Sequence, residues 1–426
     1  MALRVLIATV AEKPHFLGMV PLAWALRAAG HEVQVASQPM LTEVVAGAGL
    51  TSVPVGRDHD FWRVVRRYSL FDVLERDIPP FGRATAPLDT ISWDYLKEGY
   101  RRVVPWWWRV VNEPMTADLV AYCRAWRPDL VIWGPVTYAG AIAAQAVGAA
   151  HGRFLWGADI FGRMRAHFLR LMAERPPGDR EDLLGAWLGA HAARHGGAFS
   201  EELTRGQFTI DVIPPSLGVH AEAVRLPLRF LPYNDRAVVP EWLRTPASRP
   251  RVCLSLGISA PERHGGGQLQ DMLDACADLD VEIVATLPPE QRHRLRRVPD
   301  NTRFVGFAPL HALLPTCSAI INHGGWGTVC TALLYGVPQL ILPNWFDQPL
   351  LAARIAERGA GLSIPIAEAT GARVRGHLLR LLEEPGFRTA SRALGRDMRS
   401  LPTPNALVPR LERLAEARPA HAQSRA

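Results

Sequence analysis

Cysteine is scarce in this chain of 426 residues, and its distribution argues against two common kinds of stabilisation. The five cysteines are an odd number, lie far apart and form no C-x-x-C pair. Neither a disulfide framework nor a zinc site is therefore indicated. Most of the cysteines lie within apolar runs, which is typical of small core residues.

Long apolar runs are missing as well. None approaches the ~20 apolar residues that a membrane-spanning helix needs. The N-terminus enters a predicted strand at once (residues 3–10) and lacks the basic, apolar and small-residue pattern of a signal peptide. We therefore expect a cytoplasmic protein with no membrane interaction.

The chain has no concentrated block of charge, although its formal net charge is +7. The arginines are scattered, and no zinc finger or basic helix is evident, so a nucleic-acid partner is not expected. The positive balance favours acidic small molecules or acidic partners. It also fits a GC-rich genome, with no functional meaning. The length is enough for two domains, each with its own core.

The first part of the chain has the pattern of a β–α–β unit: a strand (3–10), a helix (19–29) and a second strand (31–36). The loop between them reads EKPHFLG, not G-x-G-x-x-G, so an oxidoreductase dinucleotide site is not expected. His15 lies in this loop, at the carboxyl end of a strand, where such folds bind ligands. A neutral imidazole there can take a proton from a hydroxyl group. Spacing alone favours the alternative, a polar loop histidine.

Residues 57–115 break this regular pattern and are rich in aromatic side chains. They could line an apolar acceptor site or dock a partner protein. Amphipathic helices that cover the sheet are the alternative. Trp106, Trp107 and Trp108 cannot all face one core from a helix, because successive residues point about 100° apart.

Five prolines between residues 226 and 250 indicate an interdomain linker. Beyond it, predicted strands (252–256, 281–285, 303–305, 319–321 and 339–342) alternate with helices, which predicts a second parallel sheet. The fold class is therefore α/β. Gly257 and Ser259 follow the first strand of this second sheet.

The stretch INHGGWGTVCTALLYGVPQLILPNWFDQP (321–349) organises the second half. Glycines let backbone amides approach an oxyanion closely, and a helix N-terminus adds positive partial charge. With hydrogen bonds from His323 and Thr328, the turn predicts a diphosphate cradle. Asp347 and Gln348, one strand later, suit sugar hydroxyls. A glycine-rich turn with nothing bound is the alternative.

HGGWGT followed by P-x-W-F-D-Q resembles the donor-binding signature of the family-one nucleotide-sugar glycosyltransferases. WRPDLVIW, FLWGADI and GQFTIDVIPPSL resemble its bacterial members that move thymidine-diphosphate (TDP) deoxysugars to macrolides or aromatic polyketides. The resemblance implies the GT-B fold: two facing Rossmann-like domains with parallel sheets and a C-terminal helix that crosses back. The expected parts are an acceptor-binding domain (1–225), the linker (226–250), a nucleotide-sugar-binding domain (251–400), and a crossing helix with a disordered tail (401–426).

The resemblance also implies an inverting transfer in which His15 is the general base. Asp159, in the segment FLWGADI, is the candidate for the aspartate that orients His15, and the sequence does not settle which aspartate has this role. The donor-binding residues that it implies are Gly257, Ser259, Phe307, His323, Gly324, Gly325, Gly327, Thr328, Asp347 and Gln348. No metal and no cofactor is expected, because the nucleotide diphosphate sugar is a substrate. The expected partners are a TDP-sugar, a hydrophobic polyketide acceptor and a cytochrome-like auxiliary activator, and a homodimer stays open.

Trp326 departs from the family pattern, which has a small residue or proline at this position. Two other classes of function stay open. One is a nucleotide-sugar epimerase of the same fold, and the other is a non-catalytic auxiliary that binds sugar nucleotide.

Overall fold

The computed structural model describes residues 2–67, 79–219, 224–257, 266–287, 292–293 and 295–417. The chain divides into two compact units. Unit 1 comprises residues 1–212, 219–229 and 402–426, and unit 2 comprises residues 213–218 and 230–401. Each unit is built around one parallel sheet, as the sequence predicts.

The sheet of unit 1 has seven strands in the order β3-β2-β1-β4-β5-β6-β7. Every pairing is parallel, and β1 lies between β2 and β4. The chain order reverses between β1 and β4, which is where doubly wound sheets bind ligands. The strands are β1 (Arg4–Ala8), β2 (Glu32–Ser37), β3 (Thr51–Pro54), β4 (Leu130–Trp133), β5 (Ala150–Phe154), β6 (Phe208–Asp211) and β7 (Arg225–Pro227). Because β7 includes residues 226 and 227, the sheet extends into the stretch that the sequence assigns to the linker.

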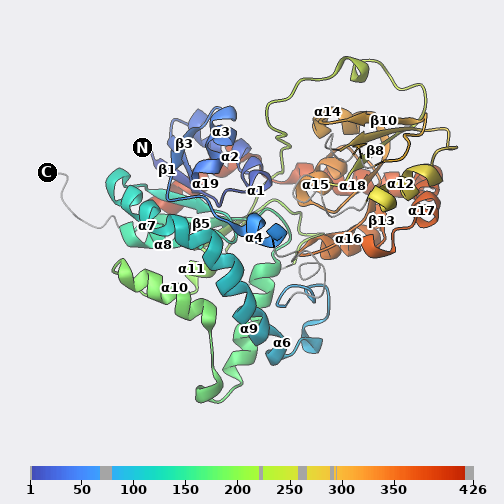
Figure 1. Cartoon of the computed structure of the whole chain (residues 1–426). Helices are drawn as coiled ribbons and strands as arrows, with labels where there is room; N and C mark the ends of the chain where they lie inside the picture. Colours follow the sequence, from blue (N-terminus) through green and yellow to red (C-terminus); the bar gives the residue numbers. More distant parts are fainter. Residues whose placement is uncertain are drawn as a thin grey trace. The chain divides into compact units, whose positions relative to one another are not determined.

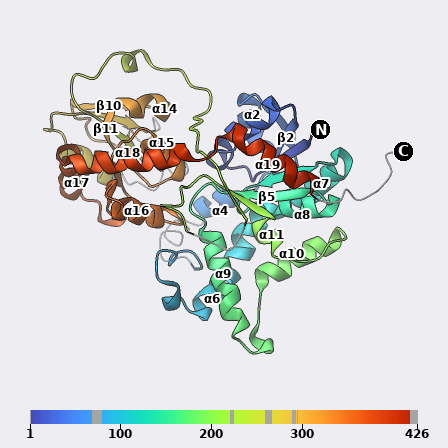
Figure 2. The ribbon, with the colours of Figure 1, turned by 180° about the vertical axis from the view of Figure 1, so that it is seen from behind.

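Helices cover this sheet, and Figures 1 and 2 both show α7 beside α8. His15 lies on a short helix, α1, where the sequence predicts a loop. Pro14 at the second position of α1 suits a helix start, because the missing N–H would have no helical partner there. The helices of unit 1 before its last segment are α1 (Lys13–Leu17), α2 (Val20–Ala28), α3 (Thr42–Gly47), α4 (Phe61–Arg67), α6 (Trp93–Val103), the π-helix η3 (Val104–Trp108), α7 (Arg109–Trp126), α8 (Tyr138–Val147), α9 (Ile160–Ala173), α10 (Leu183–Arg194) and α11 (Glu202–Arg205).

The sheet of unit 2 has six strands in the order β10-β9-β8-β11-β12-β13, all parallel. Here the chain order reverses between β8 and β11. The central strand β8 is fully buried and β11 is buried except at Ser318, as expected where helices cover both faces. The strands are β8 (Arg251–Ser255), β9 (Glu282–Thr286), β10 (Thr302–Val305), β11 (Cys317–Asn322), β12 (Gln339–Ile341) and β13 (Gly361–Ser363).

Two apolar clusters form the core of unit 2, one built around Leu254, Ile321 and Leu340 and the other around Cys253 and Ile320. Alternate residues of β8 and β11 therefore serve opposite faces of the sheet. Helices α15 and α18 pack together, as do α12 and α17. The helices of unit 2 are α12 (Gly266–Ala275), α14 (Leu310–Leu313), α15 (Trp326–Leu334), α16 (Gln348–Glu357), α17 (Gly371–Glu383) and α18 (Pro385–Ser400), with a 3-10 turn η5 (Glu241–Leu243).

The last helix, α19 (Pro404–Glu416), belongs to unit 1 and packs on α2 (Figures 1 and 2). Glu412 on α19 lies 3.2 Å from Nε2 of His31, whose Nδ1 accepts the backbone N–H of Leu3. This contact ties the end of the described chain to its beginning. Pro409 lies inside α19, in its second turn.

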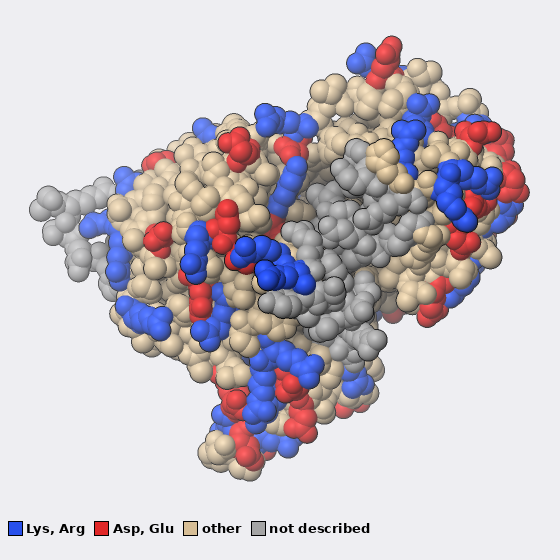
Figure 3. All heavy atoms as spheres, in the orientation of Figure 1, with Lys and Arg blue, Asp and Glu red and all other residues tan. Residues whose placement is uncertain are grey.

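None of the described helices is long and apolar enough to span a membrane. On the face in Figure 3, basic and acidic side chains are interspersed over the described surface. The net charge of +7 is thus not gathered into one basic patch on that face.

Candidate active site

In unit 2, the glycine-rich turn occupies the point where the strand order reverses. It joins β11 to α15 at residues 323–325, and the end of β8 lies beside it because the two strands pair in parallel. Gly324 has a φ of +85°, which a residue with a side chain rarely adopts. A methyl group at this position would also come within 3.2 Å of Cβ of Gln348. The turn therefore has its shape because glycine is present.

The ring of His323 is held between two glycines. A Cβ on Gly257 would lie 2.8 Å from its Cε1, and a Cβ on Gly325 would lie 2.3 Å from its Nε2. Nδ1 of His323 faces the carbonyl oxygen of Ser255 at 3.5 Å. The edge that carries Nε2 is thereby directed to the start of α15, where a protonated nitrogen can donate to an oxyanion.

The start of α15 supplies backbone donors. Gly325 is the N-cap and provides no side chain, and the first N–H groups of a helix have no partner within it. A Cβ on Gly327, the second helical residue, would meet no atom within 4 Å. Packing therefore does not require glycine at this position, which suits close approach of a ligand to the backbone.

Asn322 fixes the glycine-rich turn through hydrogen bonds, and the sequence alone does not indicate this role. Its Oδ1 accepts the N–H of Gly324 at 2.8 Å, and its Nδ2 donates to Oε1 of Gln339 at 3.1 Å. Gln339 in turn donates to the carbonyl of Val329 in α15 at 3.2 Å. Both amide side chains are fully buried, so strand β12 and helix α15 fix the turn through one polar network. A buried asparagine at a strand end is the signal that could have revealed it.

Gln348 and Asp347 stand at the start of α16, beside the turn. Oε1 of Gln348 accepts the N–H groups of Asn344 and Trp345, at 3.0 and 3.4 Å. Its carbonyl therefore orders the loop after β12, and its amide nitrogen is the part suited to a sugar hydroxyl. Asp347 is the N-cap residue and is 7% exposed. Phe346, immediately before Asp347, has a φ of +52°, a conformation that non-glycine residues adopt mainly at constrained sites.

The other residues predicted for the donor site are Phe307, Thr328 and Ser259, and each has different surroundings. Phe307 follows β10, three strands from β11, and is 55% exposed, so a face of its ring is open to a base. Thr328 is the third residue of α15 and its side chain is partly buried. Ser259 lies outside the described residues. Trp326, which departs from the family pattern, is buried against Phe230 with ring centroids 5.3 Å apart, so its indole is a packing group.

In unit 1, His15 lies where the sequence predicts, at the carboxyl end of β1. The segment before it is fixed by two fully buried residues: Gln38 accepts the N–H of Ala11 and Thr137 accepts the N–H of Val10. The ring of His15 stacks on Trp156, with centroids 4.1 Å apart and planes 4° apart. Burial lowers the pKa of His15 from 6.5 to about 3, so the imidazole is neutral near pH 7 and has a lone pair for a proton.

The structure does not bring Asp159 to His15. Both carboxylate oxygens of Asp159 accept hydrogen bonds from Arg153, at 3.2 and 2.7 Å, and one also accepts the N–H of Gly162. Asp159 therefore caps α9 and neutralises a buried arginine. Nδ1 of His15 is buried and has no hydrogen-bond partner among the described residues. The orienting role expected for Asp159 is not observed.

A continuous chain of ring contacts links His15, through Trp156 and Phe161, to aromatic residues of the irregular region. Trp156 contacts Phe161, Phe161 contacts Trp107, and Trp107 contacts Phe61, with centroids 5.6 to 6.2 Å apart. Trp108 is buried while Trp106 and Trp107 are partly exposed, as expected for three consecutive residues of a helix. The two partly exposed rings give unit 1 an apolar surface that is linked to His15 through Trp156 and Phe161.

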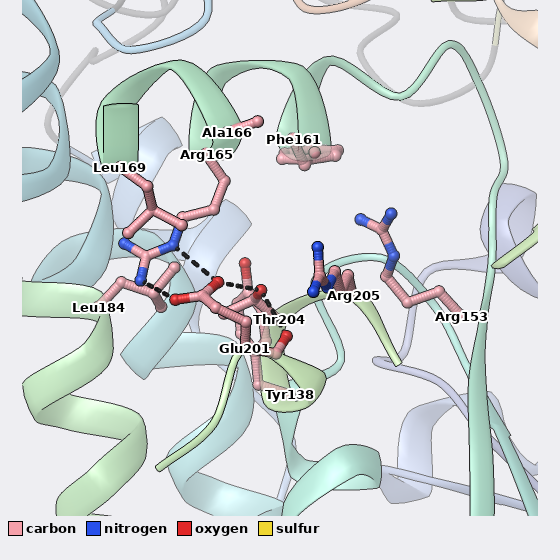
Figure 4. Close-up of a pocket in the computed structure, with 11 residues that line it drawn as sticks. Tyr138, Arg153, Phe161, Arg165, Ala166, Leu169, Leu184, Glu201, Thr204 and Arg205 are labelled. Carbon is pink, nitrogen blue, oxygen red and sulfur yellow. Dashed lines mark hydrogen bonds and ion pairs between the residues drawn. The ribbon is translucent and has the colours of Figure 1, made fainter. Parts of the chain in front are cut away.

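A small cavity lies behind this aromatic chain. Figure 4 shows Phe161 of α9 at its edge, with Arg165 paired to Glu201. Arg165 also binds Asp182 at 2.6 Å, so it joins α9 to the helices that follow. The cavity has a volume of about 40 Å³, enough for a water molecule but far below what a drug-sized ligand needs. It is therefore a packing feature and not a substrate site.

Known proteins share this architecture and these motifs. Models of the erythromycin biosynthesis protein CIII-like N-terminal and C-terminal domains match residues 24–257 and 270–414. The 10-deoxymethynolide desosaminyltransferase of Streptomyces venezuelae is 46% identical over 97% of each chain. The 3-alpha-mycarosylerythronolide B desosaminyl transferase of Saccharopolyspora erythraea is 41% identical over 98% of this chain and 99% of its own. The crystal structure of the glycosyltransferase VinC in complex with DTDP is 44% identical, with a TM-score of 0.87 over 97% of this chain and 99% of its own. The chain therefore belongs to the erythromycin biosynthesis protein CIII-like family and is a glycosyltransferase of the GT-B fold.

Proposed function

We propose that this protein transfers a deoxysugar from TDP to a hydroxyl group of a polyketide-type acceptor, with inversion at the anomeric carbon. The observation that carries the proposal is the seat of His323 between Gly257 and Gly325, at the N-terminus of α15. That arrangement suits the diphosphate of a nucleotide sugar. The desosaminyl transferases that the chain resembles and the DTDP-bound VinC support the choice of sugar and nucleotide.

Unit 2 binds the donor in this proposal. The first amides of α15, His323 and Thr328 hold the diphosphate, while Asp347 and Gln348 hold the sugar and Phe307 stacks on the base. These donors are fixed before the substrate arrives, because glycine packing and the Asn322–Gln339 network set the turn. Groups held in this way stabilise the charge of a leaving diphosphate without reorganising.

Unit 1 supplies the base and the apolar acceptor surface. The acceptor O–H proton moves to Nε2 of His15 as the oxygen forms a bond to the anomeric carbon. The bond from that carbon to the diphosphate oxygen breaks, and its electron pair leaves with TDP. The partly exposed Trp106 and Trp107 contact the apolar body of the acceptor. The auxiliary activator and the homodimer implied by the resemblance stay predictions.

A transfer assay tests this function. The protein is incubated with a set of TDP-deoxysugars and macrolactone or aromatic polyketide acceptors, with and without an auxiliary protein, and products are followed by mass and by TDP release. We expect a glycoside whose anomeric configuration is inverted, and TDP release that requires an acceptor. His15→Ala should abolish product and leave TDP binding intact, whereas the control His195→Ala, at the end of α10, should change neither. Conversion of the nucleotide sugar without acceptor would support an epimerase, and full turnover by His15→Ala would remove the base assignment.

A further inference from the structure

Glu12 sits at the N-cap of α1, three residues before His15, but does not act as a cap. Its side chain makes no capping hydrogen bond. Serine, threonine, aspartate or asparagine would stabilise this helix end better, by about 1 kcal/mol relative to a residue that does not cap. With Glu12 as its N-cap, helix α1, which carries His15, is therefore less stable than it would be with a capping residue. This is typical of a position selected for another role.

The carboxylate of Glu12 is used instead to hold Trp62. Nε1 of Trp62 donates a hydrogen bond to Oε1 of Glu12, and this contact joins α1 to α4 (Figure 1). Both side chains are partly buried. Burial raises the pKa of Glu12 to about 7, and the hydrogen bond from Trp62 opposes that rise. A carboxyl whose pKa is raised by burial is a candidate for a role in a functional site, and the contact with Trp62 gives that role a geometric basis.

The hydrogen bond between Trp62 and Glu12 connects the end of the chain of ring contacts back to the helix that carries His15. From His15 the contacts run through Trp156, Phe161 and Trp107 to Phe61. Phe61 contacts its neighbour Trp62 edge to face at 5.0 Å and stacks on Trp106 at 5.4 Å. Trp62 then returns to Glu12, and one turn of α1 leads back to His15. The circuit draws on five separate segments of unit 1, and the Glu12–Trp62 hydrogen bond is a polar link within it.

We infer that Glu12 is a positioning residue for the acceptor: through Trp62 and the buried Phe61 it fixes the partly exposed rings of Trp106 and Trp107 in register with His15. This inference rests on the proposed function, because it assigns the acceptor to that surface. Indole rings bind flat or curved apolar molecules at low entropic cost. They fix the orientation of the bound molecule only if the rings themselves are held in place by other contacts. The hydrogen bond from Trp62 on α4 to Glu12, the N-cap of the helix that carries His15, supplies that constraint.

The test is steady-state kinetics of full-length variants, with the acceptor varied at saturating donor. Losing one hydrogen bond to a carboxylate predicts that Glu12→Ala and Trp62→Phe each raise the acceptor KM about 10-fold or more, with kcat changed less than about 3-fold. The double variant should be no worse than either single variant, since both remove the same link. Glu12→Gln keeps an oxygen that accepts from Trp62 and should restore the acceptor KM to near the wild-type value.

The chain offers a matched control. Trp126 donates to Oε1 of Glu32 at 3.2 Å elsewhere in unit 1, outside the ring circuit. Glu32→Ala and Trp126→Phe should leave the acceptor KM unchanged. TDP titration of every variant reports whether unit 2 is intact.

The outcomes separate the two proposals. If the wild-type protein forms no glycoside with any acceptor, the proposed function fails. If the wild-type protein is active, an unchanged acceptor KM in Glu12→Ala overturns the positioning role alone. An equal rise in acceptor KM in the Glu32→Ala and Trp126→Phe variants would also overturn it. So would additive increases in acceptor KM in the double variant of Glu12 and Trp62.

Discussion

Replacing Gly327 with alanine separates helix stability from donor binding. The new methyl group meets no atom within 4 Å, so the ligand-free protein accommodates it. Alanine is favoured over glycine in helices by about 0.5–1 kcal/mol, which corresponds to a rise in Tm of about 1–4 °C for a unit of this size. If a phosphate oxygen approaches the backbone at this residue, the methyl group displaces it. The lost charge-assisted hydrogen bond weakens TDP binding by about 10- to 100-fold.

Thermal unfolding with and without TDP measures both effects in one assay. Without TDP the Gly327→Ala protein should melt at or above the wild-type Tm, and the increase in Tm caused by TDP should be smaller. Gly376→Ala is the matched control: it lies in α17, and a methyl group there also meets nothing within 4 Å. It should raise stability and leave the TDP shift unchanged. A wild-type TDP shift in Gly327→Ala would refute close approach of the diphosphate to this residue.

Three further predictions concern the groups that support the two sites. Because burial raises the pKa of Glu12 from 4.5 to about 7, the folded protein holds the proton more tightly than the unfolded chain, and stability falls as pH rises through this window. From pH 5 to pH 8 the free energy of unfolding of the wild type should fall by about 2–3 kcal/mol, a loss that Glu12→Gln should not show. Equal losses of unfolding free energy in both proteins would contradict the buried carboxyl. Because the pKa of His15 is lowered to about 3, kcat/KM of the Glu12→Gln protein should be flat from pH 5.5 to 8, and an acidic limb near pH 6.5 would contradict a neutral His15. Asn322→Leu removes the acceptor for the Gly324 N–H and the donor to Gln339, so it should destabilise unit 2 by about 2–4 kcal/mol and weaken TDP binding, whereas unchanged binding would exclude Asn322 from shaping the turn.

The glycine-rich turn between β11 and α15 could be predicted from the sequence because its determinants are local. Three glycines, a helix start and the preceding strand lie within a few residues, and Gly324 adopts the positive φ that only glycine readily provides. The parallel sheets follow from apolar strands that alternate with helices. Even Gly257, distant in the chain, was predictable as part of the site because β8 and β11 are central strands whose ends meet.

The environment of His15 could not be predicted in the same way. Its stacking partner Trp156 follows strand β5, which is distant from His15 in the sequence. No local pattern indicates which ring will face His15. Asp159 is close to Trp156 in sequence, but a buried arginine on β5 captures its carboxylate. The Glu12–Trp62 contact likewise depends on how α4 packs, so only the folded chain shows why the N-cap of α1 carries glutamate.

Calorimetric titration with TDP and uridine diphosphate tests the central claim most directly, using the wild-type protein, His323→Ala and the control His377→Ala on α17. We expect TDP to bind in preference to uridine diphosphate. TDP should bind at least about 10-fold more weakly to His323→Ala and with unchanged affinity to His377→Ala. A preference for uridine diphosphate would contradict the assigned donor. Binding of neither diphosphate, or undiminished binding by His323→Ala, would contradict the assignment of this turn as the donor site.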